Sequence, residues 1–296
     1  MLGTILGDVI GSKYEHHNIK TKEFELFDKR YCKFTDDTVL TIAVANKILN
    51  KSEYVDEFDE IGNKYFNCGF GGAFKRWLKS VNKKPYGSYG NGAAMRISPV
   101  AYIADNLKDI LEEAKQTTNC THNHPESIKG AGAVATAIFL AKNDYSKEHI
   151  KETIEKDFGY DLNFTLDEIR PNYSFDVSCQ GSVPQAIKSF LEANCFEDVI
   201  RTAISIGGDS DTISAIAGSI AEAYYFNNKR RKLSAGEIEY YSKIINQALL
   251  YLPNNFLDTM ENFYSEYISY SPFIHLLNTS NKYTFKEELK KKINKI

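Results

Sequence analysis

Two short acidic segments hold the residues of this sequence best suited to bind a metal ion. They are Thr35-Asp36-Asp37-Thr38 and Gly207-Gly208-Asp209-Ser210-Asp211-Thr212. Each is followed at once by small and apolar residues on more than one helical face, which is typical of a helix buried nearly all round. Packing both helices in one core would bring four carboxylates into a shared cleft, where cations or protons must offset their repulsion and lost hydration.

Each segment taken alone is also explained as an ordinary helix start. Thr, Ser and Asp are common N-cap residues, and acids in the first turn suit the helix dipole. However, Gly207 and Gly208 permit a turn in which Asp209 and Asp211 can converge, which a regular helix would prevent. Because the pattern occurs twice and one copy follows two glycines, it favours a metal site.

The available ligand atoms indicate which metal would bind. All are carboxylate or hydroxyl oxygens, since neither segment contains Cys or His. Such a set selects Mg²⁺ or Mn²⁺, and Ca²⁺ less well, while zinc and an EF-hand loop do not match. Two ligand groups on two helices favour a two-metal centre, with ions roughly 3.5–4 Å apart.

Composition is that of a globular intracellular protein. The chain has 296 residues, 43% of them hydrophobic, and a net charge of −3, so it shows no sequence-wide basic balance for nucleic acid or an acidic membrane. Its five cysteines contain no close pair of the zinc-binding kind, which suits a reducing cytosol. No apolar run reaches transmembrane length. We therefore expect a cytoplasmic protein without a membrane partner. The sequence does not specify an oligomeric state, and a monomer is our expectation.

Helical signals dominate, and strand-like alternation is scarce, which predicts an all-α protein. Helical spacing and cap-like starts predict helices over 1–13, 35–51, 53–66, 71–80, 96–118, 125–142, 146–157, 182–192, 195–205, 211–226, 235–250 and 254–268. Residues 158–181 predict a loop over the cleft. Residues 286–296 are Lys-rich with scattered Leu and Ile, which predicts a solvated amphipathic helix. No linker divides the chain, so a single domain over 1–296 is expected.

Three further segments are candidates for the surroundings of the acidic centre. In Gly7 to Glu15, glycines allow close backbone approach, and Glu15 is either a fifth carboxylate or a surface acid. Tyr86 to Arg96 contains three glycines and an Asn before a helix, which indicates either a phosphate-binding cradle or a simple glycine-rich turn. Arg96 would hold phosphate or form a structural ion pair. In Thr121 to Pro125, we interpret His122 as a hydrogen-bonding cleft residue and His124 as exposed or structural.

These five segments occur in an order that resembles the ADP-ribosylglycohydrolase family, which includes the dinitrogenase reductase-activating glycohydrolases. The matching residues are Gly7-Asp8 through Glu15, Phe34 through Thr38, Gly90 through Arg96, Thr121-His122, Ser182-Val183-Pro184, and Gly207 through Thr212 followed by Ala217-Gly218. The resemblance covers about residues 1–265, which leaves 266–296 as a C-terminal extension.

The resemblance implies a compact, many-helix orthogonal bundle around two Mg²⁺ or Mn²⁺ ions. It also implies hydrolysis of the glycosidic bond between ADP-ribose and an acceptor on a protein or a nucleic acid, with ADP-ribose as product. Carried over by position, the metal ligands are Thr35, Asp36, Asp37, Asp209, Asp211 and Thr212. Glu15 resembles a ligand or an acid/base, and Asp36 a second catalytic residue that touches the ribose. The substrate-binding residues would be Ser88, Tyr89, Gly90, Asn91, Gly92, Ala93, Ala94 and His122.

One departure from the family pattern concerns the acceptor. The dinitrogenase reductase-activating enzymes look to have an additional Asp in the segment after the second helix. The matching residues of this chain, Tyr65 to Gly72, contain no Asp. Arginine linkage is therefore in doubt, and serine-linked, other O-linked and nucleic-acid-linked ADP-ribose stay open. Gly69 to Gly72 would instead shape the cleft mouth. Two alternatives are a non-catalytic ADP-ribose-binding relative and a two-metal phosphohydrolase acting on ADP-ribose or nucleotides.

Overall fold

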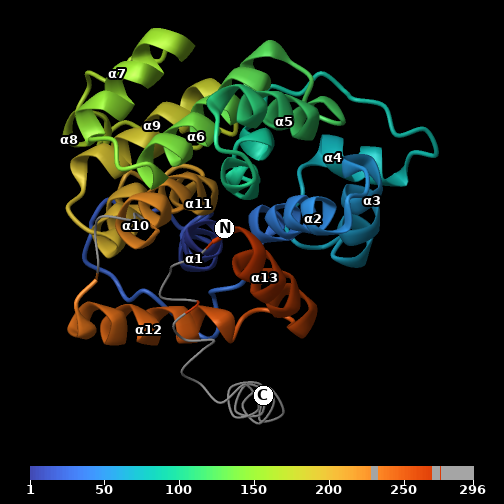
Figure 1. Cartoon of the computed structure of the whole chain (residues 1–296). Helices are drawn as coiled ribbons and strands as arrows, with labels where there is room; N and C mark the ends of the chain where they lie inside the picture. The colour runs from blue at the N-terminus through green and yellow to red at the C-terminus, as the bar shows by residue number, and fades with distance from the viewer. Residues whose placement is uncertain (228–232, 269–273, 275–296) are drawn as a thin grey trace.

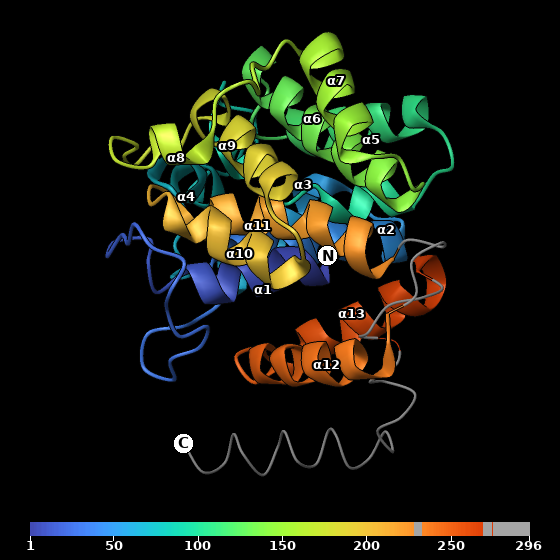
Figure 2. The same cartoon turned by 90° about the vertical axis from the view of Figure 1, so that its left-hand side faces the viewer.

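Two fully buried helices form the centre of the molecule, α1 (Leu2–Gly11) and α11 (Ser210–Ala221). They lie side by side in both views (Figure 1, Figure 2). Small residues allow their backbones to touch, since a Cβ on Gly3 would lie 2.0 Å from the Gly218 carbonyl oxygen and one on Gly7 would lie 2.1 Å from that of Ser214. Ser214 Oγ also donates to the Gly7 carbonyl at 2.7 Å. The spacing of Gly3 and Gly7 therefore allows the backbones of α1 and α11 to pack in direct contact.

The computed structural model describes residues 1–227, 233–268 and 274. Its other elements are α2 (Asp36–Asn50), α3 (Tyr54–Lys64), α4 (Gly72–Lys79), η1 (Asn91–Ala93), η2 (Ser98–Tyr102), α5 (Leu107–Asn119), α6 (Pro125–Lys142), α7 (Lys147–Phe158), α8 (Leu166–Ile169), α9 (Cys179–Glu192), α10 (Phe196–Ser205), the π turn η3 (Glu222–Phe226), α12 (Ala235–Leu249) and α13 (Asn254–Tyr267). These described residues contain no β-strand, only an isolated bridge between Gly90 and Ser178. The all-α prediction is confirmed.

The remaining helices surround the central pair. α9 and α10 pack against α11, α12 packs against α1, and α13 packs against α2. In Figure 1, α5 to α9 lie above the centre, α2 to α4 to its right, and α12 below it. No helix among the described residues is long and apolar enough to cross a bilayer.

The prediction of one helix over 96–118 is wrong. The structure has the short turn η2, an extended residue at Asn106, and then α5. Pro99 has no N–H to continue a helix, and the Asn106 side chain accepts from Asp109 N at 2.9 Å, which caps a new helix. A break was therefore encoded locally, but the apolar spacing across it concealed it.

The predicted loop at 158–181 is only partly a loop. It contains α8, which begins at a capping box between Thr165 and Glu168, and α9 begins at Cys179 after the Ser178 cap. Pro184, expected near the start of a helix at 182, lies inside α9. The helix predicted over 286–296 lies outside the described residues.

Candidate functional site

Three helices bring the site's carboxylates together: α1 and the N-termini of α2 and α11. Carboxylate oxygens of Asp8, Asp37 and Asp211 lie within 4.8 Å of one another, and so do those of Glu15, Asp209 and Asp211. Thr212 Oγ1 is 3.2 Å from Asp37 Oδ2, so the two acidic segments meet. Asp211 belongs to both groups of three, as a ligand shared between two ions would.

Asp8 was not among the predicted site residues, yet it connects α1 to α2. It is fully buried and accepts hydrogen bonds from Thr35 N at 2.9 Å and Thr38 N at 3.0 Å, as well as from both threonine hydroxyls. These bonds fix the start of α2 and the direction of Asp37. Asp8 is the only charged residue of the buried helix α1, and that sequence signal could have identified it.

Ionisation of all these carboxyl groups together is unfavourable, because they are buried close to one another. Burial raises the pKa of Asp8 to about 6 and that of Asp36 to about 8, and the charge of Asp8 adds to the shift of Asp36. Burial, and then neighbouring carboxylates, hold the pKa values of Asp37 and Asp211 well above their usual range. Asp37 Oδ1 and Asp211 Oδ1 are buried without a hydrogen-bond partner in the part of the chain described. Two orphaned oxygens in an all-oxygen donor set fit Mg²⁺ or Mn²⁺.

A cavity of about 390 Å³ opens onto these carboxylates. Six of the seven predicted metal ligands line it: Glu15, Asp36, Asp37, Asp209, Asp211 and Thr212. Thr35 lies beneath the wall, where its hydroxyl donates to Asp8 Oδ1 at 2.8 Å. Asp36 faces the cavity but belongs to neither group of three carboxylates. The structure thus brings the predicted ligands to one place, while their roles stay predictions.

The glycine-rich segment forms another wall of this cavity. Ser88, Gly90, Asn91, Gly92 and His122 line it. Asn91 Nδ2 donates to Asp209 Oδ2 at 2.7 Å, which joins this wall to the carboxylates. Three predicted substrate-binding residues are not in the lining: Ala93 and Ala94 are buried in the core, and Tyr89 is half-exposed against the His124 ring.

The structure separates the roles of His122, His124 and Arg96. His122 Nδ1 bonds to Thr121 Oγ1 at 2.9 Å, and burial, with Arg96 second, holds the pKa of His122 well below its usual range, so the ring is neutral at pH 7. His124 caps α6, in agreement with a structural residue. Arg96 is fully buried, donates to the Thr117 carbonyl and the Thr121 hydroxyl, and lies over the Phe58 ring at 4.4 Å. It has neither the phosphate nor the ion-pair role considered from sequence.

Asn18 is a second residue that sequence reasoning missed. Its amide accepts from Gly208 N at 2.7 Å and donates to Gly208 O at 2.9 Å and to Glu15 O at 3.0 Å. Gly207 and Gly208 have positive φ values of 72° and 77°, and Asn18 thus clamps their turn to the segment that carries Glu15.

We expect Asn18→Ala to weaken Mg²⁺ binding about tenfold, because outer-shell partners orient the ligands. Isothermal titration with Mg²⁺ would measure this loss. Asn63→Ala is the matched control, since Asn63 is exposed and, among the described residues, its side chain bonds only to Asp59 on its own helix. Unchanged affinity in Asn18→Ala would contradict the positioning role.

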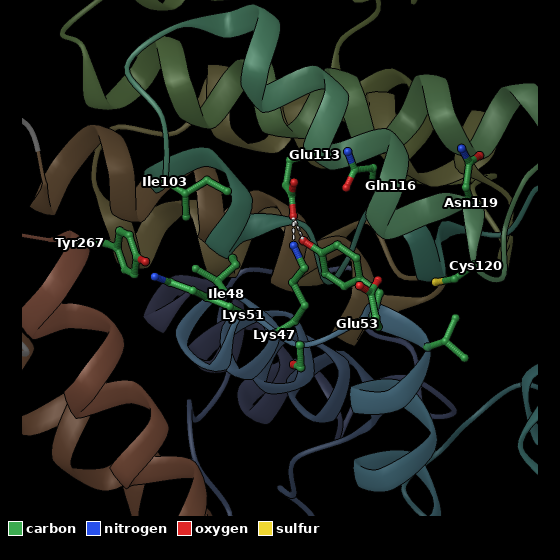
Figure 3. A pocket seen from close by; sticks show the side chains of 13 residues that line it. Lys47, Ile48, Lys51, Glu53, Ile103, Glu113, Gln116, Asn119, Cys120 and Tyr267 are labelled. Carbon is green, nitrogen blue, oxygen red and sulfur yellow. Dashed lines mark hydrogen bonds and ion pairs between the residues drawn. The ribbon is translucent and has the colours of Figure 1, made fainter.

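A larger cavity, of about 660 Å³, shares no lining residue with the carboxylate cavity. Figure 3 shows that its central charged groups are paired: Glu113 accepts from Lys47 Nζ and from the Tyr54 hydroxyl, each at 2.6 Å. Lys47 lies near the C-terminal end of α2, whereas Asp37 lies at its N-terminal end. The charges at the centre of this cavity are thus already compensated.

Comparisons with known proteins identify the family of this chain. The ADP-ribosylglycohydrolase family model matches residues 1–228, and the chain belongs to this family. It is 28% identical to the ADP-ribosylhydrolase ARH3 of Xenopus tropicalis, over 76% of this chain and 85% of that protein. Identity to human ADP-ribosylhydrolase ARH3 is 25%, over 76% and 84%. A solved structure described as an ADP-ribosylglycohydrolase-related protein complex has a TM-score of 0.61 at 21% identity and covers 84% of this chain and 93% of its own, which shows the shared fold.

Proposed function

We propose that this protein is a metal-dependent hydrolase that cleaves the glycosidic bond between ADP-ribose and a modified protein side chain. Family membership and the relatives named as ADP-ribosylhydrolases support hydrolysis of an ADP-ribose linkage. One observation carries the metal dependence: two groups of three carboxylates share Asp211 beside the glycine-rich wall. Mg²⁺ is the first candidate, and Mn²⁺ fits the same oxygens.

The proposed roles follow from position in the cavity. Glu15, Asp36, Asp37, Asp209, Asp211 and the two threonines would hold the ions, with Asp8 positioning the start of α2. Bound divalent ions supply charge stabilisation and lower the pKa of a coordinated water. Glu15, which is half-buried at the rim, accepts the proton as water oxygen bonds to the anomeric carbon and the bond to the acceptor breaks. That proton can then pass to the departing acceptor atom. Asp36 would contact the ribose.

The acceptor end of the cavity favours a linkage other than arginine. Gly69, Gly71 and Gly72 line the cavity, in the segment that lacks the Asp expected of arginine-directed enzymes from the family resemblance. A Cβ on Gly69 would lie 2.8 Å from Asp36 Oδ1, and φ is +95° there, so this position suits glycine alone. We therefore propose an O-linked acceptor, such as serine.

The direct test is turnover of serine-, arginine- and nucleic-acid-linked ADP-ribose, followed by mass spectrometry. We expect wild-type protein to release intact ADP-ribose with Mg²⁺ and to lose this activity in EDTA. Asp209→Ala should be inactive both with Mg²⁺ and with EDTA. Release of AMP or phosphate would identify a phosphohydrolase instead. Binding of ADP-ribose without turnover of any substrate would identify a non-catalytic relative.

Stability of the metal-free protein should fall as pH rises from about 4 to about 8. The folded pKa values of Asp8 and Asp36 are about 6 and about 8, both above the ordinary 3.8, so the folded state binds more protons across this range. The raised pKa of Asp8 alone should lower the free energy of unfolding by about 3 kcal/mol as pH rises, because one pKa unit corresponds to about 1.4 kcal/mol. Thermal melts in EDTA should show the decline, and excess Mg²⁺ should remove it by replacing the protons. A flat profile in EDTA would contradict the raised pKa values.

A further inference from the structure

Positive charge is concentrated in one part of this acidic chain. Residues 61–104 contain Lys64, Lys75, Arg76, Lys79, Lys83, Lys84 and Arg96 but no Asp or Glu, although the net charge is −3. Arg96 is buried, and Lys83 pairs with Asp59 at 2.5 Å. We define the α4 basic surface as Lys75, Arg76 and Lys79 of α4 together with Lys84 of the following loop. Within the described residues, none of these four forms an ion pair, although α3 carries the exposed acids Asp56 and Glu60.

This surface begins at the rim of the carboxylate cavity. Gly72 of α4 lines the cavity, and Arg76 Nη1 lies 3.6 Å from the place that a Cβ on Gly72 would occupy. Tyr86, two residues after Lys84, also lines the cavity. The part of a bound substrate that stays outside the cavity would therefore lie beside these cations.

Another part of the rim is apolar. Phe175 and Val177 line the same cavity, although their side chains are 50% and 51% exposed. The Val177 carbonyl accepts from Asn91 N at 2.8 Å, which holds this segment against the glycine-rich wall. Asp176, between them in sequence, is not part of the lining, and its carboxylate accepts from Ser178 N at 2.8 Å at the start of α9. The mouth thus offers cations on one part of its rim and exposed apolar groups on another.

We propose that the acceptor is a polypeptide whose residues near the modified side chain are acidic where they meet the α4 basic surface and apolar where they meet Phe175 and Val177. This inference rests on the proposed function. A polypeptide can alternate acidic and apolar residues within a few positions. A nucleic-acid strand carries a phosphate at every nucleotide, so it would place charge against the apolar groups as well. The mixed rim favours the polypeptide.

The test compares Arg76→Glu/Lys79→Glu with Lys115→Glu/Lys156→Glu, a control with the same charge change at exposed lysines on α5 and α7. Substrates are serine-ADP-ribosylated peptides of one frame with acidic, neutral or basic flanks, ADP-ribosyl-serine, and an ADP-ribosylated oligonucleotide. We expect the first variant to lose about tenfold in kcat/KM on the acidic peptide, mainly through KM, and the control to lose little. High salt should reduce this difference. ADP-ribosyl-serine should be hydrolysed equally by all three proteins.

Equal losses of kcat/KM by Arg76→Glu/Lys79→Glu on all three peptides would overturn the proposal. A greater loss by this variant on the oligonucleotide than on the acidic peptide would assign the surface to nucleic acid. Failure of the proposed function itself has a different signature, because wild-type protein would then release no ADP-ribose even from ADP-ribosyl-serine.

Discussion

Asp211→Asn should lower turnover of ADP-ribosylated substrate by on the order of 10³-fold and, at the same time, raise the melting temperature of the metal-free protein. Asp211 is the carboxylate common to both groups of three, so its charge serves both proposed ions. Asp211 Oδ1 has no hydrogen-bond partner in the described structure, and burial among carboxylates raises the pKa of Asp211. Asparagine has nearly the same shape without the charge, which removes repulsion while weakening metal binding.

Two measurements on one variant separate a metal ligand from a structural residue. Thermal melts with EDTA and with Mg²⁺ should show that the metal-induced gain in stability, present in wild type, is largely lost. Asp56→Asn, at an exposed position on α3, should behave as wild type in both. A variant that is less stable without metal, and still gains fully from Mg²⁺, would show that Asp211 serves the fold instead.

Gly7→Ala should destabilise the protein by about 3 kcal/mol or more, the largest stability effect that we expect from a single methyl group. The added Cβ would lie 2.1 Å from the Ser214 carbonyl oxygen and 2.3 Å from its carbon. These are backbone atoms of a fully buried helix, so no side chain can rotate away. α1 and α11 would have to separate, and that would also move Asp8 away from Asp211.

Urea denaturation would measure this change in the free energy of unfolding. Gly236→Ala is the control, because Gly236 lies in α12 and no atom of the described residues lies within 4 Å of an added Cβ. There the better helix propensity of alanine should stabilise by about 0.5–1 kcal/mol. Similar effects at the two positions would contradict the close-contact explanation.

The local sequence was informative wherever a residue acts through its own chain neighbours. Thr35 caps α2 by accepting from Asp37 N, and the apolar runs after Asp37 and Asp211 form the buried helices that they predicted. Residues 125–142 predicted α6 over its whole length. The two acidic segments were identified for the same reason, since two acids at a helix start are visible without knowledge of the fold.

Other features depend on contacts between distant segments. The sequence interpretation placed the acidic starts of two helices, α2 and α11, in the metal centre. The structure adds Asp8 of α1, which accepts from Thr35 N and has a carboxylate oxygen within 4.8 Å of those of Asp37 and Asp211. Asn18 acts on Gly208, far along the chain, and Arg96 lies over the Phe58 ring rather than in the cleft. The α4 basic surface is significant only because Gly72 and Tyr86 line the cavity.

By itself, the sequence determined an all-α protein with two acidic helix starts that could bind hard cations, because caps, periodicity and ligand chemistry are local properties. Only the tertiary structure decided that Asp211 belongs to both clusters of three carboxylates, since this requires α1 and α11 to touch through Gly7 and Ser214. Such contacts depend on the shapes of two surfaces together, and spacing along one segment does not reveal what the other presents to it.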